Sequence, residues 1–388
     1  MKIRNFKPYI TGNEIKYIKD IIDKGFDMSG DGPYTKKVHA FLEEKYKVKK
    51  AFLTTSGTTA LEFAVRLLNL KPGDEVIVPA FTFSSTANAV LINCGLKVVF
   101  ADIDKDTLNI NPNDIEKRIT DKTKAIIPVH YAGVACDMDR IMQIAKDNQL
   151  KVIEDAAQGI EAKYKDKYLG TIGDFGCLSF HDTKNITSGE GGALFINTSD
   201  QNIIERAEII SEKGTNRTKF FRGEIDKYTW VNIGSSYLPS DILAAFLLAQ
   251  LEEVEKITDL RLQAYNEYRS KLSDLEKTGV IKLPTIPEYA KHNAHIFYVL
   301  FNSETERNFV MSYLREKGIS APFHYIPLHS SPEGKQLGNK PEDCPVTESL
   351  SYRLIRLPMF AGITKEEISY VLENLKEAML KSKEKKLW

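Results

Sequence analysis

Short runs rich in β-branched residues alternate with longer amphipathic segments through the first half of the chain. This alternation limits the possible folds more than any other feature of the sequence. Runs such as EVIVP and KVVFADI indicate strands, whereas LEFAVRLLNL and DMDRIMQIAKDNQL have the apolar spacing of helices. The expected strands cover residues 75–79, 97–103, 124–130, 151–155, 177–180 and 193–197. Strands that alternate with helices predict an α/β fold with a mostly parallel, doubly wound sheet. Functional groups collect at the carboxyl ends of the strands in such a sheet.

The pattern changes in the second half of the chain. Residues 239–275 predict one long helical stretch, and the later segments HIFYVLF, ETERNFVMSYLREKG, APFHYI and KEEISYVLENLKEAML predict a smaller α/β unit. We therefore expect a large domain over residues 1–250 and a smaller C-terminal domain over residues 251–388. A hydrophobic content of 42% in 388 residues is enough to fill the cores of both.

The overall charge excludes some classes of partner. The 53 basic and 53 acidic residues cancel, so the chain has no general attraction for nucleic acid or for an anionic membrane. The four cysteines, Cys94, Cys136, Cys177 and Cys344, lack paired spacing and predict reduced thiols without a metal site. No apolar run approaches the roughly 20 residues of a membrane span. We expect a cytoplasmic globular protein that acts on small molecules.

The segment TTSGTTAL, residues 54–61, places small hydroxyl residues before a helix. The apolar positions 60, 61, 64, 67 and 68 follow helical spacing. Backbone N–H groups and the helix dipole at such a start can hold a phosphate. A plain helix cap is the alternative interpretation, because Ser and Thr cap helices in many proteins.

Two further polar residues follow predicted strands. The strand VIED ends in Asp155, whose carboxylate can keep a neighbouring ring nitrogen protonated or can satisfy backbone donors. Lys184 lies between the strand CLSF and the glycine-rich residues 188–192. A lysine amine becomes a nucleophile when burial lowers its pKa, and it then forms Schiff bases with carbonyl groups. A solvated surface lysine is the alternative.

Pyridoxal 5′-phosphate requires three groups of a protein, and the chain offers them in this order: a phosphate cradle, a carboxylate for the ring nitrogen and a lysine for the Schiff base. Phe83, in VPAFTFSSTANAV, can stack on the pyridine ring, although an aromatic residue there is more often part of a core. No GxGxxG motif opens a βα unit, which weakens the alternative of a dinucleotide-binding protein.

With these motifs the chain resembles the sugar-nucleotide aminotransferases of the DegT/DnrJ/StrS group, within the fold-type I pyridoxal-phosphate enzymes. The resemblance runs through SGTTAL, VPAFTFSSTANAV, PVHYAG, EDAAQ, SFHDTKN, GEGGAL and HYIPLHS. It implies that Lys184 binds the cofactor as a Schiff base and that Asp155 pairs with the pyridine nitrogen. It also implies that Gln158 lies near the phenolic oxygen, Phe83 on the ring, and Gly57, Thr58 and Ser179 on the phosphate.

One segment departs from the family pattern. The family often has a Gly-x-Asn-x-Arg segment whose Asn reaches the cofactor phosphate of the neighbouring subunit, and the resemblance therefore implies a homodimer. This chain has GSSYL at residues 234–238, so that Ser236 takes the place of the Asn and Leu238 the place of the Arg. A serine hydroxyl can still donate a hydrogen bond.

The segments KGTNRTKFFRGEIDKYTW and NIGSSYLPSDILAA resemble the branch that aminates dTDP-4-keto-6-deoxyglucose at C4 to give dTDP-4-amino-4,6-dideoxygalactose. The implied reaction takes an amino group from L-glutamate to form pyridoxamine 5′-phosphate and then passes it to the ketosugar. Relatives that dehydrate sugars carry a histidine in place of this lysine, so Lys184 favours transamination over dehydration. The alternatives are another ketosugar nucleotide, including a 3-ketosugar or the opposite C4 stereochemistry, and a pyridoxal-phosphate-binding protein without turnover.

Six more residues are candidates for binding the substrate. His324 and His329 can line the substrate pocket, although a histidine on a short strand is more often structural. A basic loop can meet the sugar diphosphate, and a solvated charged loop is the alternative. Its cationic residues are Lys213, Arg217, Lys219 and Arg222.

Overall fold

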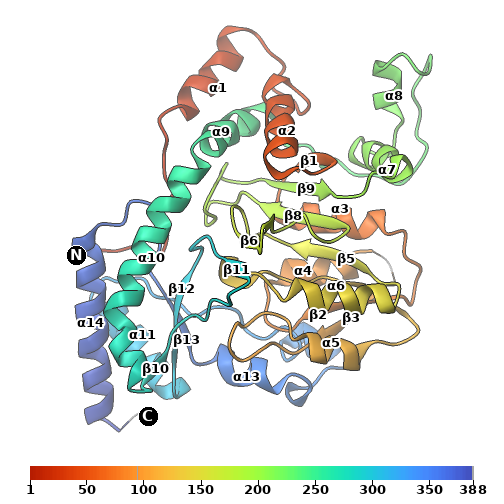
Figure 1. Ribbon diagram of the computed structural model, residues 1–388. Coiled ribbons are helices and arrows are strands. Elements are labelled where there is room, and N and C mark those ends of the chain that lie inside the picture. Colours follow the sequence, from red (N-terminus) through yellow and green to blue (C-terminus); the bar gives the residue numbers. More distant parts are fainter. Residues whose placement is uncertain (94, 387–388) are drawn as a thin grey trace.

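A computed structural model describes residues 1–93 and 95–386, and a seven-stranded sheet forms the centre of its larger part (Figure 1). The strand order is β1-β9-β8-β5-β4-β2-β3. The strands are β1 (Lys50–Thr54), β2 (Glu75–Pro79), β3 (Lys97–Ala101), β4 (Thr123–Ile126), β5 (Lys151–Asp155), β8 (Phe175–Ser179) and β9 (Gly192–Ile196). Only β9 runs antiparallel to its neighbours β1 and β8 in this sheet, and the other pairs are parallel. The predicted mostly parallel sheet is therefore confirmed.

Helices cover both faces of this sheet because its strands are apolar on both sides. In β2, for example, Val76 and Val78 face one core and Ile77 faces the other. The first core includes α3 (Gly57–Leu67), α4 (Ser84–Leu91) and α7 (Gln201–Ser211). The second includes α1 (Glu14–Asp23), α2 (Pro33–Tyr46), α5 (Pro112–Arg118), α6 (Met138–Asp147) and α9 (Asp241–Glu252).

A smaller unit is built on a three-stranded antiparallel sheet in the order β10-β12-β13. Its strands are β10 (Ile281–Lys282), β12 (Phe297–Phe301) and β13 (Leu354–Leu357), and its core is shared with α10 (Val254–Lys277), α11 (Glu304–Glu316) and α14 (Lys365–Glu384). Figure 1 shows these helices beside the small sheet, with β12 and β13 between them and the large sheet.

The remaining elements are short and lie outside these two sheets and their main helices. They are β6 (Lys163–Tyr164), β7 (Lys167–Tyr168), β11 (Ala290–Lys291), α8 (Arg217–Phe221), α12 (Pro332–Gln336), α13 (Pro345–Ser351) and the 3₁₀ turns η1 (Tyr131–Gly133) and η2 (Pro341–Asp343). Strand β11, from the C-terminal part of the chain, pairs with β6, which lies between β5 and β8 in the sequence.

Three details differ from the sequence predictions. Strand β1 was not predicted, because its five residues lead directly into the hydroxyl-rich start of α3. The single long helix predicted over residues 239–275 is wrong, since Glu253 departs from helical geometry at ψ 14° and separates α9 from α10. The short strand expected around His324 is absent, and the adjacent Tyr325 has φ 33°, which no strand accommodates. The domain boundary near residue 250 stays a prediction.

The cysteines with described positions are free and buried: Cys136, Cys177 and Cys344. Cys94 lies outside the described residues. Across residues 1–93 and 95–386, no cluster of His, Cys, Asp and Glu is placed to hold a metal ion. Within the same ranges, every helix is too short or too polar to cross a membrane.

Candidate active site

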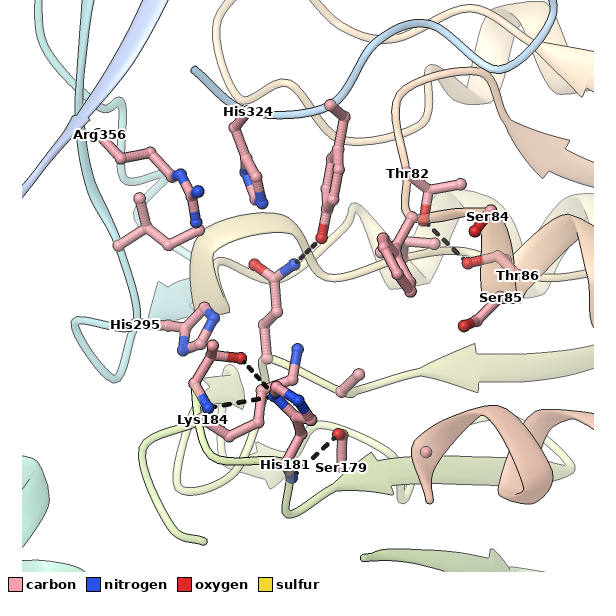
Figure 2. A pocket seen from close by; sticks show the side chains of 18 of the residues that line it. Thr82, Ser84, Ser85, Thr86, Ser179, His181, Lys184, His295, His324 and Arg356 are labelled. Atoms are coloured by element: carbon pink, nitrogen blue, oxygen red, sulfur yellow. Dashed lines mark hydrogen bonds between the residues drawn. The ribbon is translucent and has the colours of Figure 1, made fainter. Parts of the chain in front are cut away.

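A cavity of about 780 Å³ lies where the carboxyl ends of β5 and β8 and the loop after β2 meet the smaller unit (Figure 2). The strand ends supply Asp155 and Ser179, as the parallel sheet predicts. Other sequence candidates that line the cavity are Gly57, Thr58, Phe83, Gln158, Lys184 and His324. The structure thus brings together residues that lie far apart in the sequence.

The start of α3 forms one end of this cavity. Ser56 caps the helix by accepting a hydrogen bond from Thr59 N, and Thr59 Oγ1 accepts one from Ser56 N. The first N–H groups of the helix, those of Gly57 and Thr58, have no partner within the helix and remain for a ligand. A Cβ atom at Gly57 would lie 2.7 Å from the Ser179 Cβ, so this close approach to β8 requires glycine.

Hydroxyl groups surround the same helix start. Thr58 Oγ1 lies 2.6 Å from Ser85 Oγ, and Ser179 completes the lining beside them. Donors of this kind around a helix N-terminus suit a phosphate group. The arrangement is compatible with a phosphate cradle, and the phosphate contacts of Gly57, Thr58 and Ser179 remain predictions.

Asp155 is buried at the end of β5, and each of its oxygens accepts one hydrogen bond. Oδ2 accepts from Thr86 Oγ1 at 2.8 Å, and Oδ1 accepts from the N–H of Ala157 at 3.2 Å. Burial raises the pKa of Asp155, and the two hydrogen bonds and Lys184 only partly oppose that shift. A protonated ring nitrogen beside this carboxylate would supply the missing positive charge.

Lys184 lies in the loop between β8 and β9 and reaches into the cavity (Figure 2). Burial lowers its pKa to about 8, Asp155 opposes the shift, and Arg356 adds to it. The loop returns through Gly189, whose φ of 81° favours glycine, and the Gly189 carbonyl accepts a hydrogen bond from Asp182 N. The lysine is therefore an enclosed amine with a lowered pKa, as predicted, and not a solvated surface group.

The residue after this lysine anchors the loop to the smaller unit. Asn185 is buried, and its Nδ2 donates to the Asn293 carbonyl at 3.0 Å. Its Oδ1 lies 2.8 Å from His295 Nδ1. The position of the amine therefore depends on contacts between both units of the chain.

Phe83 and Gln158 line the cavity from the large unit. Phe83 is 59% exposed, so it belongs to no core, and its ring lies 6.3 Å from the ring of Tyr325. Gln158 is fixed at both ends of its amide, because Oε1 accepts from Ala132 N and Nε2 donates to the Tyr325 hydroxyl. Their contacts with a cofactor remain predictions.

Among the cavity residues that sequence reasoning missed, three with aromatic or cationic polar side chains come from the smaller unit or the segments beside it. They are His295, Tyr325 and Arg356. Burial lowers the pKa of His295 well below its usual value, so this side chain is a neutral hydrogen-bonding group. The one sequence signal for Arg356 was a charged residue inside the apolar run LIRLPMF.

The two histidine candidates have different positions. His324 lines the cavity, and its Nδ1 lies 2.8 Å from the Tyr131 hydroxyl. His329 is fully buried outside the cavity lining, with Nε2 lying 3.3 Å from the Pro341 carbonyl and 3.4 Å from Glu348. This is the structural arrangement that the sequence left open as the alternative for His329.

The basic loop and Ser236 also lie outside the cavity lining. Three of the loop's cations have acidic partners within the chain: Arg217 with Glu212, Lys219 with Glu205, and Arg222 with Glu208 and Glu224. Lys213 begins a turn at φ 61°. Ser236 is exposed on a segment that bridges to Glu212. Their roles toward a substrate or a partner subunit remain predictions.

Comparisons with known proteins agree with this geometry. The model of the DegT/DnrJ/EryC1/StrS aminotransferase family matches residues 8–376. The chain is 37% identical to the uncharacterised protein MJ1066 of Methanocaldococcus jannaschii over 96% of each chain. It is 32% identical to GDP-perosamine synthase of Escherichia coli O157:H7 over 96% of this chain and 97% of that one. Structures of Spr1654 from Streptococcus pneumoniae in the PLP and PMP forms share its fold with a TM-score of 0.90 at 28% identity, and cover 98% of this chain and at least 98% of theirs.

Proposed function

Because the chain belongs to the DegT/DnrJ/EryC1/StrS aminotransferase family, we propose that it moves an amino group from L-glutamate to the C4 keto group of a nucleotide-linked 4-keto-6-deoxysugar. The acceptor that the sequence favours is dTDP-4-keto-6-deoxy-D-glucose, and the product is then dTDP-4-amino-4,6-dideoxy-D-galactose. The cofactor is pyridoxal 5′-phosphate, which alternates with pyridoxamine 5′-phosphate.

The observation that carries the proposal is the meeting of Lys184, Asp155 and the start of α3 in one cavity. The residues fit the cofactor by their chemistry. The N–H groups of Gly57 and Thr58 would hold its phosphate. The buried carboxylate of Asp155 would pair with its ring nitrogen, and the Lys184 amine would bind its aldehyde carbon.

When bound, the cofactor supplies an electron sink for the negative charge that develops at the reacting carbon. Lys184 supplies the proton transfer, because its lowered pKa leaves a fraction of the amine neutral near neutral pH. With the cofactor bound, the neutral amine would take a proton from the α-carbon of the donor and would deliver it to the cofactor carbon that carries the amino group. The same amine would move the proton in the opposite direction when the sugar is the substrate.

The nucleotide that carries the acceptor sugar has two candidates, dTDP and GDP. The relative from Escherichia coli O157:H7 is named GDP-perosamine synthase, which favours a GDP-linked 4-keto-6-deoxysugar as the alternative. The segments at residues 213–230 and 232–245 support the dTDP-linked acceptor by resemblance. The cofactor residues are the same in both cases, so only a comparison of substrates separates the two.

Absorbance spectroscopy tests the proposed function in two steps. The pyridoxal-phosphate-loaded protein should lose its visible absorption band on addition of L-glutamate. The band should return on addition of dTDP-4-keto-6-deoxyglucose and return more slowly with a GDP-linked 4-ketosugar or a 3-ketosugar nucleotide. NMR of the product should then give the galacto configuration at C4. A band that never responds to glutamate would contradict transamination, and return of the band only with the GDP-linked sugar would contradict the dTDP assignment.

We also propose a homodimer as the working unit. The segment that carries Ser236 is exposed and lies outside this chain's cavity lining. A second copy placed against it would let the Ser236 hydroxyl reach the partner's phosphate site. Two-fold pairing is the commonest assembly of soluble oligomers.

A further inference from the structure

His295 is a buried side chain of the smaller unit that lines the cavity. It lies just before β12, and its backbone N–H donates to Asn293 Oδ1 at 3.1 Å. The Asn293 side chain is itself fixed, because its Nδ2 donates to the carbonyls of Gln158 and Ile160. The backbone at His295 is therefore anchored to the large unit at the edge of the cavity.

The hydrogen bonds of Asn185 determine which ring nitrogen of His295 carries the proton. Asn185 Nδ2 donates to the Asn293 carbonyl at 3.0 Å, so the atom that lies 2.8 Å from His295 Nδ1 is Oδ1 of the same amide. An amide oxygen can only accept a hydrogen bond. Nδ1 of His295 is therefore protonated and donates to Asn185.

The second ring nitrogen of His295, Nε2, is then a hydrogen-bond acceptor. Burial lowers the pKa of His295 well below its usual value, and the charge of Lys184 adds to this shift, so the ring is neutral. A neutral imidazole has a single N–H, which leaves a lone pair on Nε2. Within residues 1–93 and 95–386, no group hydrogen-bonds to this atom. Its donor has to come from solvent or from a ligand.

The ionised groups that enter this cavity cannot pair with Nε2. The cofactor phosphate and the two carboxylates of L-glutamate offer only acceptor oxygens. Figure 2 also shows His295 on the side of the cavity where Arg356 lies, opposite Ser85. Ser85 contacts Thr58 at the start of α3, which is the end of the cavity suited to the phosphate. A sugar hydroxyl is a donor, so the acceptor sugar is the substrate that complements His295.

The position of His295 near Lys184 favours a hydroxyl beside the keto carbon. Its partner Asn185 directly follows Lys184 in the chain, and the charge of that lysine acts on the ring. The lysine amine has to reach the keto carbon, because it moves the proton there. In a 4-keto-6-deoxysugar, C5 carries a methyl group and the ring oxygen, whereas C3 carries a hydroxyl. The C3 hydroxyl is therefore the one donor on the carbons next to the keto group.

We propose that His295 Nε2 accepts a hydrogen bond from the C3 hydroxyl of the acceptor sugar and thereby selects 4-ketosugars that carry this hydroxyl. The inference rests on the proposed function, since it requires a 4-ketosugar as the second substrate. A site of this kind discriminates against an analogue without the hydroxyl, because its own polar atom is then left without a partner.

The test measures kcat/KM for the sugar half of the reaction, starting from the pyridoxamine-phosphate form. The substrates are dTDP-4-keto-6-deoxyglucose and its 3-deoxy analogue, or the GDP-linked pair if the wild type accepts only that nucleotide. The proteins are the wild type, His295→Asn and His295→Gln. The shorter amide of His295→Asn can still donate to Asn185 but offers no acceptor at the place of Nε2. The longer amide of His295→Gln can place its oxygen there.

We expect the wild type to aminate the 3-deoxy analogue with a kcat/KM about 10- to 100-fold lower than that of the parent sugar. His295→Asn should show a similar loss with the parent sugar but lose less than about threefold with the analogue, because the hydroxyl is already absent. His295→Gln should recover part of the loss with the parent sugar. Both variants should keep the cofactor absorption band, and the rate of its loss with L-glutamate should change less than about twofold.

Each other result overturns the assignment. Losses that add, so that His295→Asn costs the analogue as much as the parent sugar, would show that Nε2 does not pair with the C3 hydroxyl. A wild type that aminates both sugars equally well would show the same without any variant. Equal slowing of both half-reactions in His295→Asn would assign Nε2 to the Lys184 amine. A wild type that reacts with glutamate but with no 4-ketosugar would contradict the proposed function as well, whereas the other outcomes contradict the role of His295 alone.

Discussion

Thr86 donates a hydrogen bond from its Oγ1 to Oδ2 of Asp155 over 2.8 Å, and this bond fixes the plane of the carboxylate at the end of β5. Thr82 Oγ1 lies 2.8 Å from the same threonine hydroxyl and orients it in turn. Each oxygen of Asp155 keeps capacity for one more hydrogen bond, because a carboxylate oxygen accepts two. The carboxylate is thus oriented by the protein and still free to bind a ring N–H.

Asp155→Asn should separate a catalytic carboxylate from a structural one. The amide keeps the size of the side chain but carries no negative charge, so the ring nitrogen loses the group that holds its proton. We expect the variant to fold and bind cofactor, while single-turnover loss of the absorption band with glutamate slows by several orders of magnitude. Thr86→Val, which removes only the orienting bond, should slow it far less. Near-normal decay in Asp155→Asn would remove this residue from the mechanism.

Gly57→Ala should weaken cofactor binding by crowding the phosphate cradle. The new methyl group would lie 2.7 Å from the Ser179 Cβ, so α3 must shift away from β8. We expect the Kd of pyridoxal 5′-phosphate to rise by about tenfold or more, measured by titration of the protein without cofactor. Ser179→Gly removes the clashing atoms and serves as the matched control.

The combination of the two changes tests the reason for the effect. If the clash is the cause, Gly57→Ala should cost less affinity in the Ser179→Gly background than in the native one. An equal cost in both backgrounds would contradict the steric explanation.

The lowered pKa of Lys184 predicts the pH dependence of the sugar half of the reaction. The neutral amine is the active form, and its pKa is about 8 instead of 10.5. Below that pKa the neutral fraction falls about tenfold for each pH unit, so the single-turnover rate should rise with pH and level off above about pH 8. The measurement starts from the pyridoxamine-phosphate form, in which the lysine is free.

A variant of the neighbouring charge provides the control for this profile. Arg356 lowers the pKa of Lys184, so Arg356→Gln should move the midpoint to higher pH. A rate that is independent of pH between about 6 and 9 would show that proton transfer by this lysine does not limit the step.

The exposed aromatic segment around Trp230 should be covered by a second copy of the chain. Trp230 is 73% exposed and Ile233 is 66% exposed, which is unusual for side chains of this size in a monomer. We expect sedimentation to show a homodimer that Trp230→Glu and Ile233→Glu together convert to a monomer with weaker cofactor binding. Leu380→Glu, at an equally exposed apolar position on α14, should leave the dimer intact. A fully active wild-type monomer would contradict the proposed assembly.

The sequence predicted the parts of the site whose signals are local. Asp155 ends strand β5, Lys184 lies in the loop shortly after β8, and the residues that cap α3 are consecutive, so their neighbours in the chain explain their positions. His295 and Arg356 reach the same cavity from the smaller unit, and only tertiary packing brings them there. The missing strand around His324 has a comparable cause, because the positive φ of Tyr325 places its side chain against Gln158 and not in a sheet.

The covalent role of Lys184 is the central claim, and chemical trapping tests it most directly. Borohydride should reduce the Schiff base in the pyridoxal-phosphate-loaded protein and leave the cofactor permanently attached. Peptide mapping by mass spectrometry should then find the label on Lys184, within the segment SFHDTKN, and Lys184→Ala should carry none. Label on a different lysine of the wild-type protein, or equal labelling of Lys184→Ala, would contradict the account.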